Sequence, residues 1–123
     1  MNPPNRMAAG ALALLLSHSA FALDCDADAG QKVFQTKCSA CHALDSDRVG
    51  PHLADVVGRP MASVKGFAYS PALAAANDSW SLERLEIWLT SPARMFPDTT
   101  MAFGGLRKAE ERNAVLCFLQ SQG

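Results

Sequence analysis

The chain has 123 residues, with 11 Lys and Arg against 12 Asp and Glu, and a net charge of −1 at pH 7. This length suggests one domain. The near balance of charge excludes the strong basic excess of a nucleic-acid-binding protein, and it gives no support for a membrane-surface helix, which would be rich in Lys and Arg.

The N-terminus has the three parts of a secretory signal in the right order. Arg6 supplies a positive charge, residues 7–16 form an apolar run too short to span a bilayer, and residues 20–22 read Ala-Phe-Ala, as at a signal-peptidase site. We therefore predict that residues 1–22 are a cleaved signal and that 23–123 form one exported, periplasmic domain. The alternatives are an uncleaved anchor and a buried core helix.

Cleavage there would leave Cys25 close to the new N-terminus, as in a lipoprotein. Asp24 argues against that option, because a sequence that resembles a lipoprotein signal would have a small residue directly before the cysteine. No later segment is apolar and long enough to cross a membrane, so we expect no stable membrane insertion. Loss of Arg6 leaves ten basic against twelve acidic residues, a net charge of about −2.

Four segments of the mature chain carry helical signals, and no run shows the alternation of a β-strand. The segments are residues 26–38, 70–77, 81–89 and 106–120. In the first segment, Asp26 can cap the helix. Gly30 lowers the stability of a helix by about 1 kcal/mol relative to Ala, and its presence there suggests that another backbone approaches closely. We predict an all-α fold with long loops, whose centre is filled by something other than the chain itself.

Cys38-Ser39-Ala40-Cys41-His42 is the CxxCH signature of covalent haem attachment. The two thiols can bond the two vinyl groups of one haem, and the histidine is then held under the iron. A thioredoxin-type site would need a βαβ context, and a zinc site would need a second pair of ligands. A local structural disulfide remains an alternative.

A histidine-bound haem iron has a sixth position, and a thioether there raises the reduction potential and favours electron transfer. Met101 is the best candidate, because it lies about sixty residues after His42 in a loop that can deliver a side chain to the far face. We interpret Met61 and Met95 as flexible core residues, with Met95 the more serious competitor. His52 is interpreted as a surface histidine.

Several further motifs follow one another in order. They are GQKVFQTKCSACH at residues 30–42, GPHL at 50–53, VGR at 57–59, GFAYSPAL at 66–73, Trp80, and WLTSPARMFPDTTMAF at 88–103. With these motifs the mature chain resembles a class I cytochrome c of the soluble electron-shuttle type. The resemblance implies an all-α fold in which crossed N- and C-terminal helices, short middle helices and long loops surround one covalently bound haem c.

The resemblance also implies roles for individual residues. The Pro51 carbonyl would accept a hydrogen bond from the His42 ring, which fixes the imidazole. The propionate groups of the haem would be bound by four other residues, Arg59, Tyr69, Trp80 and Thr99. Gly30, Phe34 and Phe118 would form the crossing of the terminal helices. The chain departs from the family's usual pattern at Asp98, where a glycine is common, at Thr100, where lysine is, and at Trp88, where tyrosine is.

If the terminal helices cross as this resemblance implies, Cys25 and Cys117 lie close enough for a disulfide. An oxidising compartment favours it, and it would contribute about 4 kcal/mol in the chain-entropy model. The alternative is a buried Cys117 and a free Cys25.

The function implied is single-electron transfer in the periplasm, with His42 and Met101 as axial ligands and no enzymatic activity. Partners would be membrane-bound or periplasmic redox proteins that meet a monomer at its haem edge, such as a cytochrome bc complex, a terminal oxidase, a reaction centre or a dehydrogenase. A basic rim could steer them: Lys32, Lys37, Arg94, Arg107 and Lys108. The alternatives are a haem subunit dedicated to one larger enzyme, or a ligand-binding or peroxidase-like protein whose methionine leaves readily.

Overall fold

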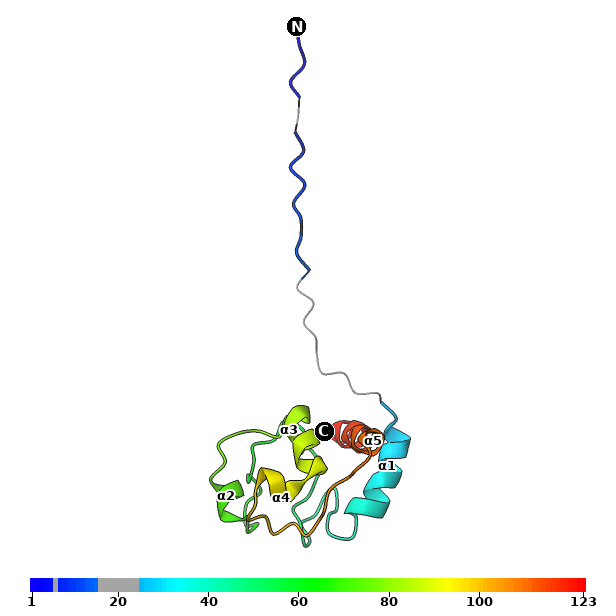
Figure 1. Ribbon diagram of the computed structural model, residues 1–123, viewed down its shortest axis with the longest axis vertical. Helices are drawn as coiled ribbons and strands as arrows, with labels where there is room; N and C mark the ends of the chain where they lie inside the picture. Colours follow the sequence, from blue (N-terminus) through cyan, green and yellow to red (C-terminus); the bar gives the residue numbers. More distant parts are fainter. Residues whose placement is uncertain (6, 16–24) are drawn as a thin grey trace.

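A computed structural model of the chain describes residues 1–5, 7–15 and 25–123, and its regular structure is helical (Figure 1). The elements are α1 (Ala27–Val33), a π-helical turn η1 (Phe34–Cys38), α2 (Pro71–Ala74), α3 (Leu82–Thr90), α4 (Pro92–Met95) and α5 (Ala109–Gln120). Among the described residues no strand is present, and a single isolated bridge pairs Pro60 with Ser79. The prediction of an all-α fold with long loops is confirmed.

The predicted signal is described only in part. Residues 1–5 and 7–15 are exposed and have no regular secondary structure, while the proposed cleavage site at residues 20–22 lies outside the described residues. None of the helices in the described part of the chain has the length and hydrophobicity needed to cross a membrane.

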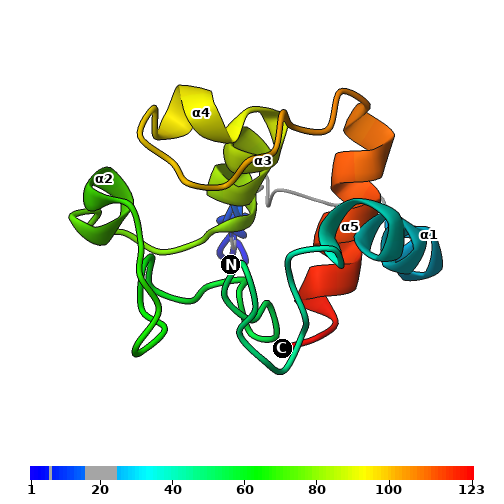
Figure 2. The same cartoon turned by 90° about the horizontal axis from the view of Figure 1, so that it is seen from below.

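Two helices from opposite ends of the chain, α1 and α5, cross at Gly30. Figure 2 shows this pair on one side of the molecule, with α2, α3 and α4 on the other. A Cβ atom built on Gly30 would lie 1.9 Å from the carbonyl oxygen of Ala114 and 2.8 Å from the Cβ of Phe118. The rings of Phe34 and Phe118 pack beside the crossing with centroids 5.5 Å apart. Glycine is therefore needed because a helix backbone, not a side chain, occupies the adjacent space.

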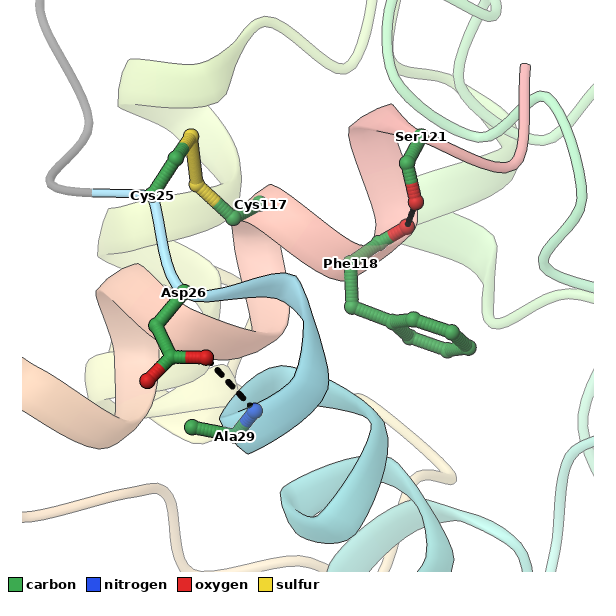
Figure 3. Close-up of a disulfide and its surroundings, with 6 residues drawn as sticks. All are labelled: Cys25, Asp26, Ala29, Cys117, Phe118 and Ser121. Atoms are coloured by element: carbon green, nitrogen blue, oxygen red, sulfur yellow. Dashed lines mark hydrogen bonds between the residues drawn. A yellow bond between two sulfur atoms is a disulfide. The ribbon is translucent and has the colours of Figure 1, made fainter.

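A disulfide joins the two helices next to their crossing (Figure 3). It links Cys25, just before α1, to Cys117 in α5, with Cα atoms 5.3 Å apart and 92 positions between the residues in sequence. Asp26 follows at once and caps α1, since its carboxylate accepts a hydrogen bond from the N–H of Ala29 at 3.0 Å. The start of α1 is thus fixed both to its own first turn and to α5.

The prediction for 81–89 is within one residue of α3 at each end, and Ser81 caps this helix by accepting a hydrogen bond from the N–H of Arg84. The prediction for 70–77 is too long, since α2 spans Pro71–Ala74. The short α4 was not predicted; it begins at Pro92, whose fixed φ suits a first helical position.

The last helix begins at Ala109, so the predicted start at Leu106 is wrong. Gly105, just before it, has φ of +100°, and the N–H of Leu106 donates to the carbonyl of Leu89 at 2.7 Å. The guanidinium of Arg112 then donates to the carbonyls of Leu106 and Arg107 at 2.7 and 3.2 Å. The backbone groups of Leu106 and Arg107, which lie outside a helix, thus find hydrogen-bond partners.

A candidate haem site

The helices and long loops surround a cavity of about 360 Å³, within the roughly 300–1,000 Å³ usual for ligand pockets. Its lining is largely apolar, with side chains such as Leu73, Leu85 and Val115. Nine of the eleven predicted site residues line it, namely Cys38, Cys41, His42, Pro51, Arg59, Tyr69, Trp80, Thr99 and Met101. The other two are the disulfide cysteines. Segments separated by more than sixty positions thus converge on one chamber.

The CxxCH segment enters the cavity from the end of the first helix. The π-helical turn η1 ends at Cys38, and the N–H of Ser39 donates to the carbonyl of Phe34 at 2.9 Å. The N–H of His42 donates to the carbonyl of Cys38, also at 2.9 Å, so the motif coils tightly. Both Cys38 and Cys41 are unbridged thiols. Burial raises the pKa of the Cys38 thiol to about 11, which keeps it protonated at neutral pH.

His42 is buried, and its orientation is set by one hydrogen bond. Its Nδ1 lies 2.7 Å from the carbonyl oxygen of Pro51. A carbonyl only accepts, so Nδ1 carries the proton and donates, which leaves the lone pair on Nε2. Burial lowers the pKa of His42, and the positive charge of Arg59 lowers it further, whereas the hydrogen bond to Pro51 raises it in part. The imidazole is therefore neutral at pH 7, the form in which histidine binds a metal.

Gly50 packs against this imidazole, and sequence reasoning missed its role. A Cβ atom there would lie 2.2 Å from Cε1 of His42 and 2.6 Å from Nδ1. The loop cannot simply back away, because the N–H of Gly50 donates to the carbonyl of Cys41 at 2.8 Å.

We therefore expect Gly50→Ala to rotate the His42 ring and break its bond to Pro51, with a loss of about 2 kcal/mol of stability from overpacking. The haem-loaded variant should show an altered optical spectrum and a lower urea midpoint. Gly104→Ala is the control, since a Cβ at Gly104 meets nothing within 4 Å. Equal spectra and midpoints for both variants would contradict this account of Gly50.

The residues expected to bind propionates lie along the cavity with part of their hydrogen bonding already used. The guanidinium of Arg59 donates to the carbonyls of His52 and Ala54 at 3.0 and 3.3 Å, which ties it to the loop after Pro51. The phenol oxygen of Tyr69 accepts from the N–H of Val64 at 3.1 Å, so its own proton is free to be donated. The backbone N–H of Trp80 donates to the carbonyl of Arg59 at 2.9 Å. These donors are positioned by backbone contacts.

Ser70 is a second residue that sequence reasoning missed. It is only 4% exposed, it lines the cavity, and its hydroxyl has no hydrogen-bond partner. A buried hydroxyl without a partner is costly, so this oxygen indicates a polar group of a bound molecule. Its position directly after Tyr69 in the GFAYSPAL motif was the available signal.

The three methionines that follow the predicted signal occupy different positions relative to the cavity. Met101 lines the cavity, Met61 is buried in the core, and Met95 packs against the core without lining the cavity. Met101 is held locally, because its N–H donates to the hydroxyl oxygen of Thr99 at 3.1 Å. Thr99 itself faces the cavity, with part of its hydrogen-bonding capacity used within the loop.

His52 and most of the basic residues expected at the haem edge do not line the cavity. His52 does not line it; its N–H and ring Nδ1 both contact Oδ1 of Asp47, at 2.9 and 2.7 Å. These hydrogen bonds lower the pKa of Asp47. Within the described residues no cluster of three His, Cys, Asp or Glu could hold a metal ion. Of the five basic residues expected around the haem edge, Lys37 alone lines the cavity.

The cavity residues fit a haem. Two free thiols at CxxC spacing, a neutral imidazole with a free Nε2 lone pair and a thioether suit an iron porphyrin, and the apolar walls suit its ring. The unpartnered hydroxyl of Ser70 and the free donor of Tyr69 suit its carboxylates. Trp88 is buried at the same cavity, with its ring centroid 5.4 Å from that of Trp80.

Comparisons with known proteins agree with this fit. The cytochrome c family profile matches residues 27–123. The chain is 44% identical over 97 residues to the cytochrome c-type cyt cy of Rhodobacter capsulatus, a match that covers 78% of this chain and 49% of that protein. It is 40% identical over 98 residues to the cytochrome c of Stellaria longipes, covering 77% and 91%.

Among solved structures, cytochrome cH from Methylobacterium extorquens superposes with a TM-score of 0.74 at 34% identity, covering 78% of this chain and 98% of that one. The chain spans about half the length of the Rhodobacter relative and nearly all of the Stellaria and Methylobacterium proteins. The chain belongs to the cytochrome c family, whose members are electron carriers with one covalently attached haem c.

Proposed function

We propose that the chain is a periplasmic single-electron carrier whose haem iron is held by His42 and Met101. The observation that carries this proposal is the 2.7 Å hydrogen bond from Nδ1 of His42 to the Pro51 carbonyl, which leaves Nε2 for a metal in a cavity that Met101 also lines. When bound, haem supplies one-electron exchange between Fe(II) and Fe(III), and a thioether ligand raises its potential. The Pro51 carbonyl keeps the imidazole in one tautomer and orientation in both states.

Cys38 and Cys41 would attach the haem. Each thiol would add across one vinyl group, with its sulfur bonded to one vinyl carbon and its proton transferred to the other, and without any oxidation. The tight coil that follows Cys38 supports this role, because it keeps His42 next to both attachment points. The attached group would then be fixed relative to the imidazole.

Four side chains would bind the propionates, namely Arg59, Tyr69, Trp80 and Thr99, and we add Ser70. A charged group of a ligand that enters an apolar cavity needs hydrogen bonds or an opposite charge. The guanidinium of Arg59 offers the charge, and Tyr69 and Ser70 offer hydroxyl protons. These residues would hold the porphyrin in one rotation about its attachment.

We further propose that residues 1–22 are a cleaved export signal and that the product is a periplasmic monomer. The order of charge, apolar run and Ala-Phe-Ala supports the signal. The Cys25–Cys117 disulfide is consistent with an oxidising compartment. Membrane-bound or periplasmic redox proteins would be the partners, reached through the haem edge near Lys37.

Met101→Ala tests the proposed ligation. The oxidised wild type should show the weak long-wavelength sulfur-to-iron band, and the reduced wild type should not bind carbon monoxide. The variant should lose the band, bind carbon monoxide and drop in potential by a few tenths of a volt, within the roughly 0.8 V that axial ligands span. Met95→Ala should behave as wild type. A wild type without the band that binds carbon monoxide readily would contradict the proposal and indicate an open iron.

A further inference from the structure

The loop of residues 97–105, which carries Met101, is attached to the rest of the molecule by very few hydrogen bonds. Inside it, the N–H of Met101 donates to Thr99, and that of Phe103 donates to the Met101 carbonyl at 2.8 Å. Within the described part of the chain, a single hydrogen bond joins it to a distant segment. The N–H of Ala72 donates to Oδ2 of Asp98 at 2.9 Å, across 26 positions of sequence.

Asp98 accepts a hydrogen bond from the N–H of Ala72, a backbone group that has no partner within α2. Ala72 is in the first turn of α2, which begins at Pro71, and N–H groups in a first turn have no partner within the helix. A carboxylate is the strongest side-chain acceptor for such an N–H, because the bond is charge-assisted. Asp98 does not have a positive φ, so its position does not require glycine's conformational freedom.

This hydrogen bond joins two walls of the haem cavity. On the α2 side, Ser70 lies two residues before Ala72 and Leu73 directly after it, and both line the cavity. On the loop side, Thr99 and Met101 follow Asp98 closely and line it as well. If the bond is lost, the loop is held at its two ends and by side-chain packing alone.

We propose that Asp98 is a positioning residue that fastens the loop of residues 97–105 to α2 and thereby holds Met101 at the iron. This inference rests on the proposed function, since it takes Met101 to be the ligand. Asp98 is exposed and does not line the cavity, so it acts through the loop and not by contact with the haem. An external ligand can reach the iron only when Met101 leaves, so the rate of its entry reports how often the loop opens.

The test measures imidazole binding to the oxidised, haem-loaded protein in stopped flow. Asp98→Ala should bind imidazole about tenfold faster, the effect of losing one charge-assisted hydrogen bond. Asp98→Asn keeps an acceptor oxygen without the charge, so its rate should lie between those of Asp98→Ala and wild type, and it replaces the alanine variant if that fails to fold. Asp45→Ala removes an exposed carboxylate to which no group of the described residues is hydrogen-bonded, and it should match wild type.

Amide hydrogen exchange at Ala72 is a second readout, independent of the iron. It should be faster in Asp98→Ala and unchanged in Asp45→Ala. Equal imidazole rates in all four proteins, with the sulfur-to-iron band present, would overturn the role of Asp98 and leave the proposed function intact. A wild type that lacks the band would overturn both.

Discussion

Replacing Gly30 with alanine is expected to lower the free energy of unfolding by about 3 kcal/mol, at the upper end of overpacking effects. The new Cβ would lie 1.9 Å from the Ala114 carbonyl oxygen, so α1 and α5 must separate. That separation also weakens the packing of Phe34 on Phe118. The backbone of a helix cannot rotate out of the way as a side chain can. Urea unfolding of the haem-loaded protein measures the loss.

The control for Gly30→Ala is Gln31→Ala, which changes the next and exposed position of the same helix. On propensity alone, alanine at position 30 would stabilise the helix by about 1 kcal/mol, so propensity and packing predict opposite signs. A Gly30→Ala protein that is as stable as wild type, or more stable, would show that the helices do not cross as closely as the structure has them.

The second large effect is expected from the double variant Cys25→Ser/Cys117→Ser. Removal of a cross-link between residues 92 positions apart should cost about 4 kcal/mol, because the unfolded chain regains the freedom that the closed loop denied it. Both cysteines are changed together so that neither thiol is left to pair wrongly. The measurement is urea unfolding, with wild type in the presence and absence of a thiol reductant.

Reduced wild type should approach the stability of the double variant, and the reductant should leave the variant unchanged. If haem is attached as proposed, the thiols of Cys38 and Cys41 are consumed in the haem-loaded protein, and thiol labelling then reports on Cys25 and Cys117 alone. Two labelled thiols in unreduced native protein, together with equal stabilities, would rule out the disulfide.

The residues that would contact a haem could be predicted from the sequence, because the spacing and order of their motifs are enough to recognise them. CxxCH fixes two thiols and an imidazole, and the order of the later motifs predicted the cavity positions of Arg59 and Met101. Ser70 and Gly50 were missed because their importance depends on neighbours in space. The hydroxyl of Ser70 lacks a partner only inside the folded cavity, and Gly50 is restricted only by the ring of His42.

Helix bounds failed where tertiary contacts replace helical hydrogen bonds. Leu106 has the apolar character and spacing of a helix residue, yet its N–H and carbonyl are bound by Leu89 and Arg112. The four residues of α4 are too few to show a helical period. The pairing of Cys25 with Cys117 stayed open for a similar reason, because only the crossing of α1 and α5 brings the two residues together.

The crossing at Gly30 also bears on the order of covalent steps as the protein matures. Four cysteines can form six different pairs, and each pair other than Cys25–Cys117 uses Cys38 or Cys41, which is then unavailable for a thioether. When α1 docks on α5, Cys25 and Cys117 are held with Cα atoms 5.3 Å apart, while Cys38 and Cys41 line the cavity. Cys117 is then only 3% exposed, and attack by a reductant must come at Cys25. Docking of the terminal helices thus pairs two of the thiols with each other and leaves the two that the proposed haem attachment requires in reduced form.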